Sequence, residues 1–358
     1  MIICVVTPYD SNNFGAFLQA YALKRVLELD GHTVHHIRLR SGRETRRLFY
    51  TPYPSMVQLG DVGDWIKGYR FGRRKRELFA RDAARLSTVD LKSAATADVV
   101  VLGSDEIWNI RHRSFRKPVF YGRGFQHVIA YAPSVGSARY EDFCEHAGLI
   151  EDLRRVEAVM VRDANTADFV TTATSVTPPL VIDPTMLYRW SESLPSAEDG
   201  YLDSHKYLLV YAYNSKHLPV DQLRLYAGNR GLKIVSAGFH MDWCDRTVNC
   251  SPLEFLDVVA RAECVFTTTF HGSIAAILKR RQFLSHPTSP KTEDLLGRLG
   301  LLGRVYRGRL AEAMESELLY EEVFERIEAE RASSQAILRR ALARMSESNG
   351  ANPSGEQS

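Results

Sequence analysis

The chain reads CVFTTTFHGSIAAIL from Cys264 to Leu278. An apolar run, a threonine-rich turn and a second apolar run predict a strand, a tight turn and a helix, the repeating unit of an α/β fold. The turn places His271 and Gly272 at the start of the helix. Free backbone N–H groups and the helix dipole attract anions at such a position. The motif therefore predicts a proton carrier beside an anion site. A histidine that only caps or packs at the turn fits these residues equally well.

The same alternation of short β-type runs and helical patterns extends over most of the 358 residues. This length suggests two domains. We expect a first α/β domain over residues 1–190, a polar linker over 191–204, and a second α/β domain over 205–310. A helical segment over 311–345 and a disordered tail over 346–358 should follow. The expected strands are Ile2–Thr7, Thr33–Arg38, Val99–Leu102, Val128–Ala132, Ala158–Val161, Leu180–Ile182, Tyr207–Tyr213, Lys233–Ser236, Cys264–Thr268 and Gln282–Ser285.

Small and polar residues follow nine of these expected strands. In an open parallel sheet, ligands bind beyond the carboxyl ends of the strands. Turn residues favour Gly, Asn, Asp and Ser in any protein, so only the agreement across the strand ends is informative. We therefore predict two Rossmann-like sheets that face each other across a central cleft, which is the GT-B-like architecture.

Composition limits the class of protein. Apolar residues make up 45% and charged residues 25%, which is typical of a folded soluble protein. The five cysteines are scattered, odd in number and form no C-x-x-C pair, so we expect a reducing compartment without a disulfide framework. The first residues lack a basic lead, and no apolar run is long enough to span a bilayer. We predict a cytoplasmic protein, and no cluster of side chains has the spacing of a metal site.

The stretch 38–85 is unusually basic, with thirteen Lys/Arg against five Asp/Glu, although the whole chain has a net charge of only +3. Aromatic residues are interleaved with these charges. Such a patch can meet phosphates, an anionic membrane surface or nucleic acid. An ordinary solvated helical insertion is the simpler interpretation. We expect peripheral contact with the inner face of the membrane and no nucleic-acid partner.

Several residues after the strands carry candidate chemistry. Asn13 and Gly15 begin the first expected helix, where glycine allows close approach of a ligand or simply a tight helix start. Asp105 directly follows a buried strand and is suited to act as a base on a sugar hydroxyl, or as a helix cap. Trp108 is suited to stack on a sugar. Arg162, also at a strand end, can bind a carboxylate or phosphate in a bidentate manner through its guanidinium, although an ordinary surface arginine fits as well.

These motifs, taken in order, resemble the polysaccharide pyruvyl transferase family. The resemblance covers residues 1–306. It implies a GT-B-like fold and transfer of the pyruvyl unit of phosphoenolpyruvate to two hydroxyls of one sugar, with release of phosphate. The acceptor would be a surface polysaccharide or its precursor, which can be lipid-linked, and phosphoenolpyruvate would be a co-substrate with no further cofactor. The segments that carry the resemblance are NFGAFLQAYAL, GSDEIWN, YAPSVGS, VRD, VIDPT, SPLEFL, FTTTFHG and LLGRLGL.

The resemblance also implies roles. His271 would be the general acid that protonates the methylene carbon of the donor. Arg162 and the N–H groups of Gly272 and Ser273 would hold the donor's anionic groups, and Asp105 would serve as the base on the acceptor side. Substrate contacts are further expected from Asn13, Gly15, Ser104, Trp108, Asp183 and Lys216.

The sequence departs from the family pattern at one place. Some members carry an anion-binding arginine just before the His–Gly pair, where this chain has Thr269 and Phe270. A second cation would then come from Lys216 or Arg298. Two other functions stay open: a GT-B glycosyltransferase that uses a nucleotide-sugar donor, and a non-catalytic protein that binds glycan or phosphate.

Overall fold

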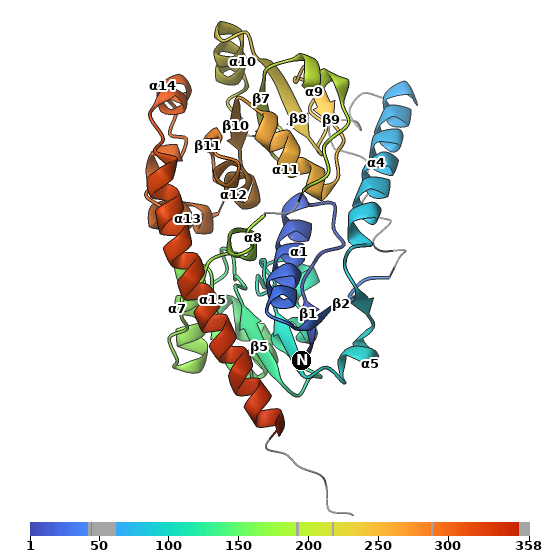
Figure 1. Ribbon diagram of the computed structural model, residues 1–358, viewed down its shortest axis with the longest axis vertical. Coiled ribbons are helices and arrows are strands. Elements are labelled where there is room, and N and C mark those ends of the chain that lie inside the picture. Colours follow the sequence, from blue (N-terminus) through green and yellow to red (C-terminus); the bar gives the residue numbers. More distant parts are fainter. Residues whose placement is uncertain (42–43, 45–61, 191–192, 217, 288, 351–358) are drawn as a thin grey trace, which may run out of the picture.

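The computed structural model describes residues 1–41, 44, 62–190, 193–216, 218–287 and 289–350. Two parallel sheets, each flanked by helices, lie one beyond the other along the long axis of the molecule (Figure 1). Within the predicted basic stretch 38–85, residues 42–43 and 45–61 fall outside the described residues, as do residues 191–192 of the predicted linker.

The first sheet has six parallel strands in the order β3-β2-β1-β4-β5-β6. The predicted strand Leu180–Ile182 is not one of them, because only Leu180 pairs, through an isolated bridge to Val161. The two-residue strand β3 was not predicted. The strands are β1 Ile2–Val6, β2 Thr33–Ile37, β3 Thr88–Val89, β4 Val99–Leu102, β5 Val128–Tyr131 and β6 Ala158–Met160.

The second sheet has five parallel strands in the order β11-β10-β7-β8-β9. In both sheets the chain builds outward from the first strand on one side and then returns to its other side. The order therefore reverses between β1 and β4 and between β7 and β10, where such sheets bind ligands. The predicted two-sheet, GT-B-like class is confirmed. The strands are β7 Tyr207–Tyr211, β8 Lys233–Ala237, β9 Arg246–Val248, β10 Cys264–Thr267 and β11 Gln282–Ser285.

Several helices begin at side-chain caps that the sequence provides. Asn13, Asp163 and Thr269 each accept a hydrogen bond from a backbone N–H of the helix that follows, and Ser251 with Glu254 forms a capping box. The helices are α1 Phe14–Leu29, α4 Val62–Ala83, α5 Leu91–Ala94, α6 Ala147–Leu153, α7 Ala164–Thr174, α8 Pro184–Leu187, α9 Gly200–Ser204, α10 Val220–Asn229, α11 Pro252–Arg261, α12 Phe270–Leu278, α13 Pro290–Arg298, α14 Leu310–Glu315 and α15 Tyr320–Gly350.

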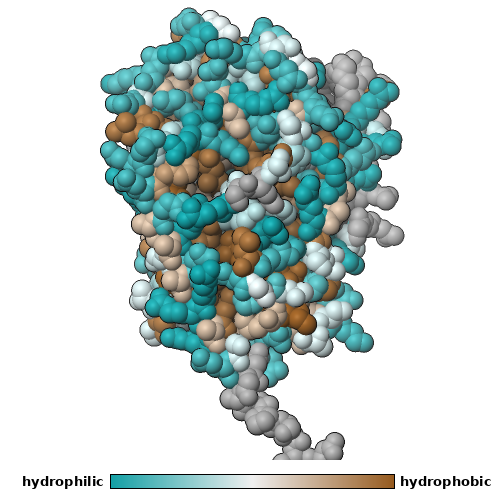
Figure 2. All heavy atoms as spheres, viewed as in Figure 1, coloured by the Kyte–Doolittle hydropathy of each residue, from teal (hydrophilic) through white to brown (hydrophobic). Residues whose placement is uncertain are grey.

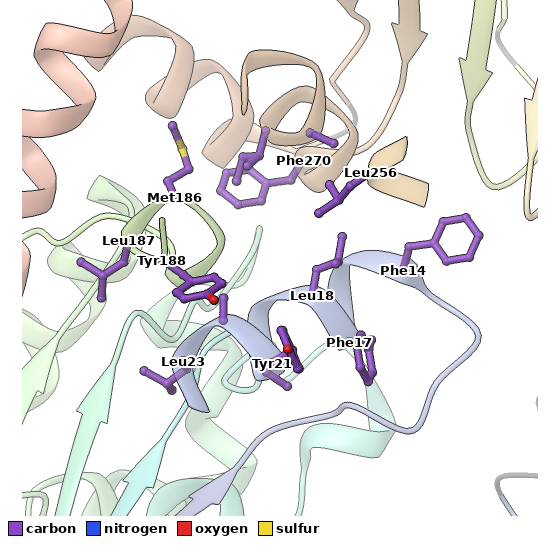
Figure 3. Packing of buried hydrophobic residues seen from close by; sticks show 14 of the residues in the cluster. Phe14, Phe17, Leu18, Tyr21, Leu23, Met186, Leu187, Tyr188, Leu256 and Phe270 are labelled. Atoms are coloured by element: carbon purple, nitrogen blue, oxygen red, sulfur yellow. The ribbon is translucent and has the colours of Figure 1, made fainter. Parts of the chain in front are cut away.

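Helix α1 joins the two sheets through a common hydrophobic core (Figure 3). At its start, the ring of Phe14 stacks on Phe79 of α4, Phe255 of α11 and Tyr211 of β7, with ring centroids 5.4, 4.8 and 5.7 Å apart. Further along, Leu18 points from α1 toward Leu256 of α11 (Figure 3). Because α1 is buried on almost all sides, its N-terminus is held firmly at the cleft.

The long helix α15 runs from the second sheet back along the first (Figure 1). Its Ser334 Oγ accepts a hydrogen bond from the Ile182 N–H at 2.9 Å, and Arg331 Nε donates to the Met186 carbonyl at 2.9 Å. The helix continues through residues 346–350, which were predicted to belong to a disordered tail, and residues 351–358 lie outside the described part. The C-terminal helix therefore ties the two domains together.

Helix α4, the described part of the basic stretch, packs on the second domain although it connects strands of the first. Asp82 accepts a hydrogen bond from the Leu253 N–H at 2.9 Å, and the Phe71 carbonyl accepts one from Asn249 at 2.7 Å. The face of the molecule in Figure 2 is largely hydrophilic, with apolar residues in separate patches. Among the described residues, no helix has the length and apolar composition that crossing a bilayer requires.

Candidate active site

A pocket of about 540 Å³ opens between the two sheets at the carboxyl ends of their strands. Its walls are the loops that follow strands of both sheets, including β1, β4, β7, β10 and β11. Asn13 and Asp105 contribute from the first domain, and Tyr213, His271 and Lys291 from the second. Asn13 Nδ2 donates to the Tyr213 hydroxyl at 2.9 Å, so a hydrogen bond joins the two walls. The pocket lies where the topology of both sheets predicts a ligand site.

His271 stands at the start of α12, one residue after its first position, and only 7% of it is exposed. It meets the start of α1, where a Cβ at Gly15 would lie 2.2 Å from the Nδ1 of His271. Only glycine permits this approach, so Gly15 makes room for the imidazole. Gly15 was predicted to contact substrate, but it lies behind His271 rather than in the wall of the pocket.

The Nε2 of His271 is 3.8 Å from Asp183 Oδ2, which is too long for a hydrogen bond. Within the described part of the chain this buried nitrogen has no hydrogen-bond partner. Burial lowers the pKa of His271 to about 4, although the charges of Asp183 and Asp105 oppose the shift. The imidazole is therefore neutral near pH 7 in the ligand-free protein.

Asp183 and Arg162 form a buried network beneath His271. Arg162 Nη1 donates to Asp183 Oδ2 at 2.6 Å and to Ser104 Oγ at 3.1 Å, while Thr185 donates to Asp183 Oδ1 through its N–H at 2.9 Å. Burial disfavours the carboxylate, but His271, Arg162 and Thr185 outweigh it and hold the pKa of Asp183 below its usual range. Ser104 and Asp183, which were predicted to contact substrate, are both fully enclosed in this network.

Arg162 lies behind the pocket wall. Its side chain is 1% exposed, its Nη2 is 3.5 Å from Asp105 Oδ1, and its guanidinium carbon is 4.8 Å from the centroid of the Phe270 ring. Asp105 and Phe270 line the pocket, whereas Arg162 does not. Its Nε and Nη2 have no hydrogen bond among the residues described. The guanidinium is thus a fixed positive charge one layer below the surface of the site.

Asp105 faces the pocket from a strained turn. Its φ of 75° lies in the left-handed region, which aspartate tolerates better than most residues. No helix begins directly after it, so the alternative role as a helix cap is wrong. Asp105 Oδ1 accepts the N–H of the next residue, Glu106, at 2.9 Å, in addition to its approach to Arg162. Its carboxylate is therefore placed at the pocket wall, opposite the second domain.

Trp108, which was predicted to stack on a sugar, lies in the core rather than in the wall of the pocket. The side chain is fully buried, its Nε1 donates to the Phe120 carbonyl at 2.9 Å, and its ring lies 6.4 Å from that of Tyr121. The indole is a core residue of the first domain because its one polar atom finds a backbone partner there. The aromatic side chains that do line the pocket are Phe115, Tyr213, Phe239 and Phe270.

The start of α12 is less open to anions than the sequence suggested. The Gly272 N–H donates to Thr269 Oγ1 at 2.9 Å, and the Ser273 N–H donates to the Thr269 carbonyl at 3.2 Å. Both groups predicted to bind an anion are therefore occupied within the helix itself. By helix geometry, the N–H groups of Phe270 and His271 are the ones that remain without an intrahelical partner.

The basic side chains that line the pocket, Arg40 and Lys291, are neither of the two predicted. Lys216 is exposed and lies outside the pocket wall, while Arg298 reaches Glu330, at 3.3 Å, and the backbone of Arg162. Lys291 lines the pocket instead, with its side chain 9% exposed and its Nζ 2.6 Å from Glu106 Oε1. The helix-start signal Ser289-Pro290 after the last expected strand could have drawn attention to this lysine.

No group of three His, Cys, Asp or Glu that could hold a metal ion occurs in the described ranges. Residues 13–285 match the family model for polysaccharide pyruvyl transferase. The chain belongs to this family. No curated protein matches the sequence. Members of the polysaccharide pyruvyl transferase family are thus the relatives against which the site must be interpreted.

Solved structures of other families resemble the chain loosely. The Methanocaldococcus jannaschii UDP-GlcNAc 2-epimerase in complex with UDP-GlcNAc and UDP is 12% identical, with a TM-score of 0.48 over 96% of this chain and 99% of that one. The spinosyn forosaminyltransferase SpnP is 13% identical, with a TM-score of 0.49 over 97% and 99%. A Streptomyces glycosyltransferase complexed with thymidine diphosphate is 14% identical, with a TM-score of 0.44 over 96% and 99%. We infer nothing about substrates from likenesses this distant.

Proposed function

We propose that this polysaccharide pyruvyl transferase family member transfers the pyruvyl group of phosphoenolpyruvate to two hydroxyls of one sugar, in a surface polysaccharide or its precursor. The observation that carries the proposal is the imidazole of His271, whose Nε2 has no hydrogen-bond partner in the described residues although it lies in the wall of the pocket between the sheets. Buried polar atoms are normally paired, so an unpaired one on a residue that lines a pocket indicates a functional group.

The reaction needs one proton carrier and one acceptor-side base. The donor's methylene carbon takes a proton and becomes a methyl group, while the first sugar hydroxyl bonds to the neighbouring carbon. The second hydroxyl then displaces phosphate from that carbon. Of the two hydroxyl protons, one restores the acid and the other leaves with the phosphate, so the products are a cyclic ketal and hydrogen phosphate.

His271 supplies the proton in this scheme, and Asp105, on the opposite wall, accepts a proton from a sugar hydroxyl. Asp183 and Arg162 act as positioning residues, because they lie behind the wall. Asp183 sets its negative charge 3.8 Å from Nε2 and favours the imidazolium when the donor is bound. Arg162 neutralises Asp183 and holds Asp105 near its Nη2.

Titration of the purified protein with phosphoenolpyruvate, and separately with UDP- and GDP-sugars, tests the proposal through thermal stabilisation. A ligand at a hundred times its Kd adds about 2.7 kcal/mol to the free energy of unfolding, which is easily seen. We expect stabilisation by phosphoenolpyruvate. Stabilisation by a nucleotide sugar alone would contradict the proposal and favour a glycosyltransferase. A protein that binds both requires a product mass, because a nucleotide-linked sugar could also be the acceptor.

We propose that the acceptor is lipid-linked and that the protein binds it at the inner face of the membrane. Support comes from the exposed arginines of α4, among them Arg70, Arg73 and Arg74. Basic residues near an anionic surface contribute about 1 kcal/mol each at most, and salt screens them.

A further inference from the structure

Phe115 is an aromatic side chain of the pocket wall to which the proposed reaction gives no role so far. It ends the short helical turn Arg113–Phe115, in the loop that follows β4 of the first domain. Its N–H donates to the His112 carbonyl at 2.9 Å, and its ring stands edge-on against that of Phe120, with 5.4 Å between the centroids. The half-buried ring is therefore anchored to a core residue while it lines the pocket.

The phenylalanine rings that the second domain contributes to the wall already have partners. The Nζ of Lys291 and the guanidinium carbon of Arg162 lie 5.0 and 4.8 Å from the centroid of the Phe270 ring. Phe239 is only 6% exposed, and the Nζ of Lys75 lies 3.9 Å from the centroid of its ring. A cation over a ring occupies the face that a sugar would need. Neither ring is therefore a good platform for a ligand.

Tyr213 offers an exposed ring on the second domain, across the pocket from Phe115. Its side chain is 47% exposed, and its ring stands edge-on to Phe239, with 5.2 Å between the centroids. The proposed base, Asp105, belongs to the first domain, as Phe115 does. A sugar whose hydroxyl meets Asp105 therefore has Phe115 as the aromatic platform of its own domain, and Tyr213 can cover it from the other side.

The first domain also supplies polar groups to this wall. Arg40 Nη1 donates to Asp10 Oδ1 at 2.7 Å, which balances the charge of the guanidinium. A guanidinium has several N–H donors, so this contact leaves others for a ligand. Ser11 Oγ is buried, lines the pocket and has no hydrogen bond to any described residue. Because Arg40 is neutralised and Asp105 is negative, this wall suits an uncharged ligand with hydroxyl groups better than an anion.

We propose that these first-domain residues form the acceptor subsite, in which an uncharged sugar ring stacks on Phe115 while Arg40 and Ser11 hydrogen-bond its hydroxyls. This inference rests on the proposed function and names the class of sugar that receives the pyruvyl group. A pyranose ring presents C–H groups on one face, which pack on an aromatic ring, and hydroxyls around its edge. The anionic donor meets His271 on the opposite wall, so each substrate is recognised by a different domain.

Substitutions at Phe115 separate stacking from a structural role. Phe115→Leu keeps an apolar side chain but removes the flat ring, and it should weaken binding of a neutral sugar about 2- to 12-fold. Phe115→Trp keeps an aromatic face and should retain the affinity. Neither variant should change the Kd of phosphoenolpyruvate. Phe324→Leu is the matched control, because Phe324 is a half-buried phenylalanine of α15 that does not line the pocket.

The experiment measures the Kd of simple sugars for the wild type and these variants by saturation-transfer NMR. The probes are the methyl glycosides of glucose, galactose, mannose and N-acetylglucosamine, with methyl glucuronide and methyl galacturonide as charged counterparts. We expect at least one neutral glycoside to bind more tightly than both uronides, in a manner that Phe115→Leu weakens and Phe115→Trp and Phe324→Leu do not. Tighter binding of a uronide, or equal affinity of the wild type and Phe115→Leu, would overturn the subsite.

Calorimetry with phosphoenolpyruvate on the same samples distinguishes this inference from the proposed function. Wild type that binds phosphoenolpyruvate but none of the glycosides overturns the acceptor subsite alone. Wild type that binds a neutral glycoside through Phe115 but no phosphoenolpyruvate supports the sugar subsite and overturns the proposed donor. A loss of phosphoenolpyruvate affinity in Phe115→Leu that equals the loss of sugar affinity would show that the ring only maintains the shape of the pocket.

Discussion

Binding of phosphoenolpyruvate should be accompanied by uptake of a proton at His271. In the free protein, burial holds the pKa of this imidazole at about 4, so it is uncharged at pH 7 and cannot act as an acid. Charging it at pH 7 would cost about 4 kcal/mol, at 1.36 kcal/mol per pH unit. One negative charge about 4 Å away, at an effective dielectric constant of 20, contributes about 4 kcal/mol in the opposite direction. A donor anion in the pocket therefore raises the pKa to near 7.

The sign of the pH dependence follows from these two values. When the pH is below the pKa of His271 in the complex and above its pKa in the free protein, the complex holds one proton more than the separate components. Donor affinity should therefore rise about tenfold for each pH unit as the pH falls from about 7 toward about 4. Calorimetry at pH 6 in two buffers with different ionisation enthalpies should give uptake of about 0.9 proton per donor at His271, and about 0.1 at pH 8.

The phosphate of the donor titrates in the same range, so the comparison that matters is with His271→Gln. This variant keeps a polar side chain of similar size but cannot take up the proton. Uptake at pH 6 should fall by most of one proton, and turnover should fall by roughly 100- to 10,000-fold, the usual contribution of a general acid. Equal proton uptake by the wild type and the variant would refute the reasoning.

Three further predictions concern other parts of the chain. Lys75→Met should raise the free energy of unfolding at pH 7 by up to about 5 kcal/mol, because burial lowers the pKa of Lys75 to about 7 and the unfolded chain takes up the proton below about 10.5. In urea unfolding this gap should close as the pH rises from 7 toward 10.5, and a gap that stays constant would contradict it. Arg162→Lys should lower the free energy of unfolding by about 1–3 kcal/mol, because one ammonium cannot replace the guanidinium's several contacts. It should also raise the apparent KM for phosphoenolpyruvate more than the apparent KM for the acceptor. A change in the KM for the acceptor alone would show that Arg162 serves acceptor binding instead. Replacing Arg70, Arg73 and Arg74 by Gln should weaken co-sedimentation with anionic vesicles at low salt, by up to about 1 kcal/mol per residue, and wild type that does not sediment at low salt would argue against membrane contact.

The architecture was predictable because it depends on hydrophobic periodicity. Buried runs such as Val99–Leu102 and Cys264–Phe266 are apolar over their whole length, as expected of parallel strands covered on both faces. The short strands β3 and β9 escaped prediction, since each contains a single apolar residue, Val89 and Val248. The end of α15 was also missed, because its polar last turns resemble a tail in composition.

The site was predictable only as a set of loops. Sequence order shows that Ser104, Asp105 and Trp108 follow a strand, but not which of them turns toward the cleft. That choice depends on the backbone, which turns Asp105 outward at a φ of 75° while Trp108 packs into the core. The network of Asp183 with Arg162 and the pair of Lys291 with Glu106 join residues far apart in sequence, and no local pattern reveals such contacts.

The most direct test of the proposed reaction is the mass of the product formed from phosphoenolpyruvate and a bacterial-type surface glycan or its lipid-linked precursor. We expect phosphate release that depends on both substrates, and an acceptor whose mass has increased by about 70 Da, as expected when one pyruvylidene unit replaces two hydroxyl hydrogens. His271→Gln should give neither. An acceptor that stays unchanged with phosphoenolpyruvate, but gains the mass of a sugar residue when a nucleotide sugar is supplied, would contradict pyruvyl transfer.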